Sequence, residues 1–142
     1  DRIALLSQIA EKLTALKVTF RFIIVTKKVK EIPLIEIRKE RINQEDLGEF
    51  YNQTNVILDL VRDQQTGLSF RIFEAMAYQK KIITSNAAVR NYDFYNPNNI
   101  LVLDENNLQI DAHFFTTTYQ PIPDEIYQKY TLSHWVDTIF EL

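Results

Sequence analysis

Apolar positions along the chain follow two different periods. In the first 17 residues, Ile3, Leu6, Ala10 and Leu13 recur at intervals of three or four, which predicts an amphipathic helix. Residues 18–26 are mostly β-branched or aromatic and end in a continuous apolar run, which is typical of a strand buried on both faces. The same patterns predict further strands at 34–37, 55–61, 81–85 and 100–103, and further helices at 43–52, 68–79 and 132–142.

The order of these elements favours an α/β fold in which parallel strands form a sheet that helices cover on both faces. The chain has 142 residues, enough for one domain with a buried core at 1–142. Because it opens with a helix, and with Asp1 rather than Met, we expect a piece of a longer protein. Ligands of such sheets bind outside the carboxyl ends of the strands, so we expect a site in the loop after strand 55–61.

Composition excludes several classes of function. The chain has no cysteine, which rules out disulfides, thiolate metal sites and cysteine nucleophiles. It has two glycines, Gly48 and Gly67, too few for a dinucleotide fingerprint or a Walker-type phosphate loop. A formal net charge of −3 gives no basic footprint for nucleic acid. The longest apolar runs have four residues, against the roughly 20 that a membrane-spanning helix needs.

The loop and helix after strand 55–61 carry the candidate chemistry. The start of a helix offers free backbone amides and the positive end of the helix dipole, and Gly67 would let a phosphate approach closely. Glu74 lies two turns further along the same helical stripe, where its carboxylate could accept hydrogen bonds from two ribose hydroxyls. Spacing alone equally allows a plain solvated helix, with Thr66 as N-cap and an ion pair between Arg71 and Glu74.

Three stretches of the sequence, taken together, resemble a known family. They are NVILDLV at 55–61, QQTGLSFRIFEAMAYQKKIITSN at 64–86 and YDFYNPNNILVLD at 92–104. In this order they are similar to the carboxyl-terminal, donor-binding domain of GT-B type glycosyltransferases, in a bacterial group associated with lipopolysaccharide and capsular polysaccharide synthesis. The resemblance implies a Rossmann-like nucleotide-sugar-binding domain that forms one half of a two-domain GT-B fold.

The resemblance also implies roles for particular residues. Gly67 and Leu68 would offer backbone amides to the donor diphosphate, and Glu74 would hold the ribose. Arg71 could neutralise phosphate charge, while residues 84–86 would border the same cleft. The implied donor-binding residues are Gln65, Thr66, Gly67, Leu68, Arg71 and Glu74. No Asp-x-Asp pair occurs in the chain, so we expect no metal bound by it and no cofactor beyond the nucleoside diphosphate sugar as substrate.

The implied reaction transfers a sugar from a nucleoside diphosphate to a hydroxyl of a polysaccharide or lipid-linked acceptor. The missing amino-terminal domain would supply the acceptor site and any general base, so catalytic residues stay unassigned and we expect the chain alone to be inactive. We expect it in the cytoplasm, at the inner face of the membrane if the basic run contacts lipid. That run, at 27–41, has six Lys or Arg against three Glu, and could equally keep a sheet edge soluble.

One departure from the family pattern leaves alternatives open. Retaining GT-B enzymes carry a pair of glutamates at a fixed spacing, and the position eight residues before Glu74 holds Thr66 instead of the first of them. Retention and inversion therefore both stay possible. A non-enzymatic module that binds a nucleotide or a protein is the second interpretation of the chain. A GT-B-like nucleotide-sugar epimerase is the third.

Overall fold

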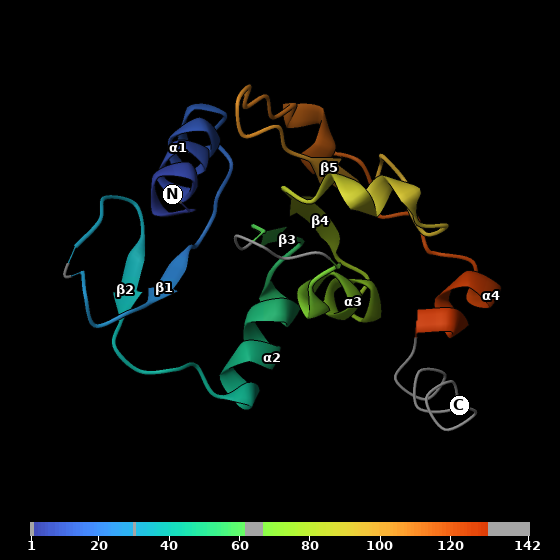
Figure 1. Ribbon diagram of the computed structural model, residues 1–142, viewed down its shortest axis with the longest axis horizontal. Coiled ribbons are helices and arrows are strands. Elements are labelled where there is room, and N and C mark those ends of the chain that lie inside the picture. The colour runs from blue at the N-terminus through green and yellow to red at the C-terminus, as the bar shows by residue number, and fades with distance from the viewer. Residues whose placement is uncertain (1, 30, 62–66, 131–142) are drawn as a thin grey trace.

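The computed structural model describes residues 2–29, 31–61 and 67–130 (Figure 1). The predicted helix at 132–142 lies outside these residues. In chain order the described elements are α1 (Arg2–Ala15), β1 (Ile23–Val25), β2 (Glu36–Arg38), α2 (Gln44–Gln53), β3 (Val56–Asp59), α3 (Phe70–Ala77), β4 (Lys81–Thr84), the 3-10 helix η1 (Ala87–Asn91), β5 (Ile100–Val102), the 3-10 helix η2 (Ala112–Phe115), α4 (Asp124–Tyr127) and the 3-10 helix η3 (Gln128–Tyr130).

All the described strand pairs are parallel, as an α/β fold requires. In the larger sheet β4 lies between β3 and β5, and Ile82 of β4 pairs with Ile57 of β3 and with Ile100 of β5. The sequence predicted one parallel sheet, but β1 and β2 pair with each other in a separate two-stranded sheet. Of the predicted strand at 18–26, only Ile23–Val25 is a strand, and it pairs with β2.

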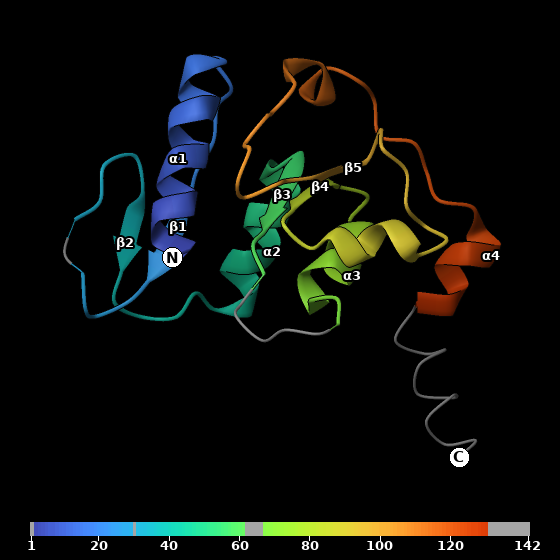
Figure 2. The same cartoon turned by 45° about the horizontal axis from the view of Figure 1, so that its top comes forward.

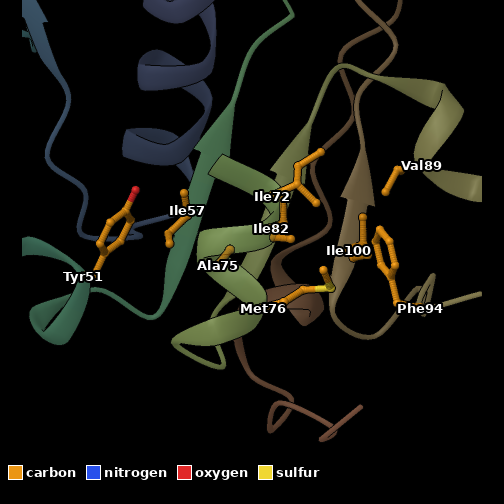
Figure 3. Packing of buried hydrophobic residues seen from close by; sticks show 9 residues of the cluster. All are labelled: Tyr51, Ile57, Ile72, Ala75, Met76, Ile82, Val89, Phe94 and Ile100. Carbon is orange, nitrogen blue, oxygen red and sulfur yellow. The ribbon is translucent and has the colours of Figure 1, made fainter. Parts of the chain in front are cut away.

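The larger sheet is covered on both faces. Alternate residues of β4 point to opposite sides, so that Ile82 packs in one apolar cluster and Ile83 in another. The first cluster holds Ile72, Ala75 and Met76 of α3, which lie against the strands in Figure 3. The second holds the buried side of α1 and is closed by Phe114. The β1–β2 sheet and α4 lie at opposite ends of the molecule (Figures 1 and 2).

A buried lysine begins the central strand. Lys81 is 4% exposed, and its ammonium donates hydrogen bonds of 2.6 Å to the carbonyl oxygen of Phe114 and to the hydroxyl of Thr117. The same ammonium lies 4.9 Å from the centre of the Phe114 ring. Burial lowers the pKa of Lys81 below its ordinary value, because an apolar environment disfavours the charged form. These contacts fasten the chain after β5 to the start of β4.

The Asn-Pro-Asn-Asn turn before β5 serves as an anchor for the chain that follows. The side-chain amide of Asn99 donates to the carbonyl oxygen of Gln120 at 2.7 Å and accepts from its backbone N–H at 2.9 Å. Asn98 donates to the carbonyl oxygen of Thr118 at 2.8 Å. Asn99 is buried, so these bonds satisfy polar groups that would otherwise be costly.

Helices α1 and α3 both end on a non-glycine residue in the left-handed region. These residues are Lys17, with φ of 60°, and Gln79, with φ of 55°. After α3 the N–H of Lys80 donates to the carbonyl oxygen of Ala75 at 2.9 Å, the closing bond of a Schellman motif, and the end of α1 has the same pattern. Glycine is favoured at this position because any residue with a Cβ is strained in the left-handed region. The non-glycine residues that end α1 and α3 therefore lower the stability of the fold.

Replacing either left-handed residue by glycine is therefore expected to stabilise the fold. Lys17→Gly and Gln79→Gly should each raise the free energy of unfolding in urea by about 1 kcal/mol, because both side chains are exposed and only backbone strain is removed. Glu11→Gly, in the middle of α1, is the control and should lower it by about 1 kcal/mol. A loss of stability in the first two variants would show that their backbones are unstrained.

Candidate functional site

A buried carboxylate joins three elements at the carboxyl edge of the larger sheet. Asp59, the last residue of β3, is 6% exposed and pairs in register with Thr84 of β4. The hydroxyl of Ser69 donates to Oδ1 of Asp59 at 2.7 Å, and that of Thr84 donates to Oδ2 at 3.0 Å. Since Ser69 directly precedes α3, this carboxylate fixes the start of that helix relative to both strands.

A second set of hydrogen bonds frames the segment that leads from β3 to α3. Oγ of Ser85 accepts from the backbone N–H of Val61 at 2.8 Å, on one side of residues 62–66. On the other side, the side-chain amide of Asn86 donates to the carbonyl oxygen of Gly67 at 3.3 Å. The backbone N–H of Asn86 in turn donates to Oγ1 of Thr84 at 3.0 Å. The residues after β4 therefore hold both ends of the loop in which the sequence placed the site.

The start of α3 differs from the predicted one. The sequence predicted a helix over 68–79, with Thr66 as the N-cap if the helix were a plain solvated one, but the helix is Phe70–Ala77 and its N-cap is Ser69. The Ser69 side chain makes no capping hydrogen bond, and its hydroxyl is directed to Asp59, to which it donates. No side chain at the N-cap position therefore occupies the first-turn amides, which an N-cap serine ordinarily does.

Gly67 lies shortly before this helix start. It is exposed, its φ is not positive, and a Cβ built on it would meet no atom of the described residues within 4 Å. Neither turn geometry nor packing in the described chain therefore requires glycine at this position. An expected phosphate-binding role would explain a glycine here, because a side chain would stand between the backbone and a ligand.

Glu74 lies on the half-buried side of α3 and is paired with a residue of α2. The hydroxyl of Tyr51 donates a hydrogen bond to Oε2 of Glu74. Tyr51 is 7% exposed, and its ring stacks on that of Tyr78 with 4.9 Å between ring centres. Burial, and then the hydrogen bond to Glu74, raise the pKa of Tyr51, while the charge of Arg71 opposes the increase. The phenol is therefore a hydrogen-bond donor at neutral pH.

The residues predicted for donor binding fall into three groups. Gln65 and Thr66 lie outside the described residues. Gly67 and Leu68 precede α3, whereas Arg71 and Glu74 lie in it. The expected ion pair between Arg71 and Glu74 is not among those formed within the described chain, where Tyr51 is the partner of Glu74 instead.

Three residues of this region, namely Asp59, Ser69 and Tyr51, were not predicted from the sequence. A carboxylate inside the apolar run NVILDLV was a signal for Asp59, since a buried charge requires partners. Ser69 could have been recognised as an N-cap type residue at the start of an apolar helix. For Tyr51 there was no signal, because it lies 23 residues before Glu74 and on another helix.

Asp93 and Phe94 have structural roles. Asp93 accepts from the ammonium of Lys129 and from the hydroxyl of Tyr130, each at 2.7 Å, so it docks η3. These donors, Lys129 first, hold the pKa of Asp93 below its ordinary value. Phe94 is 3% exposed and belongs to the apolar cluster under α3. Tyr92 and Tyr95, on either side of Phe94, are partly buried and pack against the same cluster.

Three further properties of the described residues bear on the site region. Within residues 2–29, 31–61 and 67–130, no three His, Asp or Glu side chains gather in a way that could hold a metal ion. Over the same residues, no helix is long and apolar enough to cross a membrane. Two open hollows lie on the described surface, one between α1 and residues 105–108 and one along residues 38–43.

The fold and the comparisons together give the class of protein. Parallel strands covered by helices on both faces, with a polar loop region at their carboxyl edge, define a Rossmann-like α/β domain. The glycosyl transferase-like family matches residues 2–117, most of the 142-residue chain. The chain therefore belongs to this family, and a general role in glycosyl transfer follows. No curated protein and no solved structure matches the chain significantly.

The hydrogen bond between Ser69 and Asp59 can be tested by two substitutions. Ser69→Ala should lower the free energy of unfolding in urea by about 1–3 kcal/mol, because the buried carboxylate of Asp59 loses a hydrogen-bond donor. Ser69→Asp should also lower it, although aspartate is a favourable N-cap, because two carboxylates would then face each other. A gain of stability in Ser69→Asp would show that the residue acts as an ordinary cap.

Proposed function

We propose that this chain is the donor-binding, carboxyl-terminal half of a GT-B glycosyltransferase. It binds a nucleoside diphosphate sugar, from which the complete enzyme transfers the sugar to a hydroxyl acceptor in bacterial surface polysaccharide synthesis. The observation that carries the proposal is the N-cap of α3. The Ser69 side chain donates to Asp59 and makes no capping hydrogen bond to the first turn of α3, which begins three residues after the exposed Gly67.

The diphosphate would lie at this amide end. Backbone N–H groups and the helix dipole favour an anion there, and the amides of Gly67 and Leu68 extend the same surface before the first turn. Arg71 is exposed on the first turn of α3 and can approach the phosphates with its guanidinium. Together these groups stabilise the negative charge that develops on the departing diphosphate. GT-B transfer requires this stabilisation, and here it would come from the helix and Arg71 and not from a metal bound by this chain.

The ribose would lie further along α3, against Glu74. Two vicinal hydroxyls are donors that match the two oxygens of one carboxylate. Tyr51 engages Oε2 of Glu74, and a carboxylate has about four acceptor positions, so capacity for the ribose is retained. In the absence of a glutamate at position 66, the donor sugar itself would contact Gln65 or Thr66.

The acceptor would come from outside this chain. We propose that an amino-terminal domain closes over the carboxyl edge and brings the polysaccharide or lipid-linked sugar, together with any general base. The enzyme would act in the cytoplasm, where nucleotide sugars are held, and at the inner membrane face. The basic run at 27–41 would favour anionic lipid there, although Arg38 within it is already paired with Glu36 at 2.7 Å.

Titration with nucleotides tests the ribose contact. The chain should bind at least one of UDP, GDP, ADP and CMP in calorimetry, and should bind its 2′-deoxy form about 10-fold more weakly. Glu74→Gln should weaken binding of the ribonucleotide about 10-fold and that of the deoxynucleotide less, because the carboxylate acceptor is lost and the deoxynucleotide has only one of the two hydroxyls that it binds. Glu105→Gln, an exposed carboxylate in the turn after β5, is the control. If the wild-type chain bound none of these nucleotides, the protein-binding module would be the better explanation.

Gly67→Ala tests the phosphate contact separately. The added methyl meets no atom of the described chain within 4 Å, so the free energy of unfolding should stay unchanged. Binding of the nucleoside diphosphate should fall about 10-fold or more, because the methyl occupies space next to the phosphates, while binding of the nucleoside alone should not change. Gly48→Ala is the matched control. Equal diphosphate affinity in Gly67→Ala and the wild type would remove Gly67 from the site.

A further inference from the structure

Tyr51 makes a contact between α2 and α3 that packing does not require. Tyr51 is 7% exposed in the apolar cluster and its ring stacks on Tyr78, contacts that phenylalanine would make equally. Its hydroxyl, however, reaches beyond the ring to Oε2 of Glu74. The hydroxyl is thus the polar end of a fixed ring, placed on the carboxylate that the proposed function assigns to the ribose.

A glutamate alone is poorly suited to select between two similar sugars. Its side chain has three rotatable bonds, and ordering it on binding costs free energy that the hydrogen bonds must first offset. Tyr51 removes much of this cost, because a buried ring with few rotamers holds one carboxylate oxygen in place before a ligand arrives. Oε1 and the remaining lone pair of Oε2 then point in defined directions.

We infer that Tyr51 is a positioning residue that fixes the Glu74 carboxylate for the two ribose hydroxyls and so sets the preference of the site for ribonucleotides over deoxyribonucleotides. This inference rests on the proposed function, because it needs a ribose at Glu74. Tyr51 does not touch the ligand. It acts through Glu74, and its contribution is therefore a selectivity between sugars rather than an affinity for phosphate.

The test is the ratio of dissociation constants for the 2′-deoxy and the ribose form of the same nucleoside diphosphate. Tyr51→Phe keeps the buried ring and removes only the hydroxyl, and it should reduce this ratio about 5-fold, as expected for one lost orienting hydrogen bond. Tyr127→Phe, a partly buried tyrosine of α4, is the matched control and should keep the wild-type ratio. A general loss of structure cannot imitate the result, because a reduced folded fraction weakens both apparent affinities by the same factor.

The outcomes separate the inference from the function on which it rests. A wild-type preference for ribose that Glu74→Gln and Tyr51→Phe both diminish supports the inference. If Glu74→Gln abolishes the preference and Tyr51→Phe retains it in full, the inference is overturned and the donor site stands. If the wild-type chain binds nucleotide without any preference for ribose, the ribose contact and this inference are overturned, while nucleotide binding stands. If it binds no nucleotide, the proposed function is overturned as well.

Discussion

The carboxylate of Asp59 is the constraint on which the carboxyl edge of the sheet depends. A buried negative charge must be satisfied by hydrogen bonds, and among the described residues its donors are the residue before α3 and the end of β4. The pairing of β3 with β4 and the entry of α3 are thereby fixed by one group. The loop between β3 and α3 consequently starts and ends at positions that the sheet itself determines.

The order and type of the elements could be predicted because they follow from local patterns. The central strand, predicted from its apolar run, is buried at all four positions, and Asn43 caps α2 by accepting from the N–H of Asp46 at 2.8 Å. The predicted start of α3 was two residues too early, because the apolar periodicity of the helix continues back to Leu68. A contact with Asp59, ten residues away, decides instead that Ser69 ends the loop. The pairing of β1 with β2 in a separate sheet could likewise not be predicted, because residue patterns within a strand do not indicate its neighbour.

The candidate site was only partly accessible from the sequence, for a physical reason. Helical spacing places Glu74 on a stripe apart from the core residues of α3, and this needs no knowledge of other elements. The partner of Glu74 depends on how α2 packs on α3, and no periodicity within either helix encodes that pairing. Family membership supplies the general chemistry of glycosyl transfer. The assignment of particular groups to phosphate and ribose depends on the tertiary contacts described above.

Lys81 has a consequence for the order in which the molecule assembles. The middle strand of the sheet cannot bury its first residue until the acceptors at Phe114 and Thr117 have arrived, more than 30 residues later in the chain. Before that moment the ammonium must stay hydrated, and water must therefore reach the amino end of β4. During synthesis, the sheet would remain loosely closed at this end until the polypeptide beyond β5 had emerged and folded back.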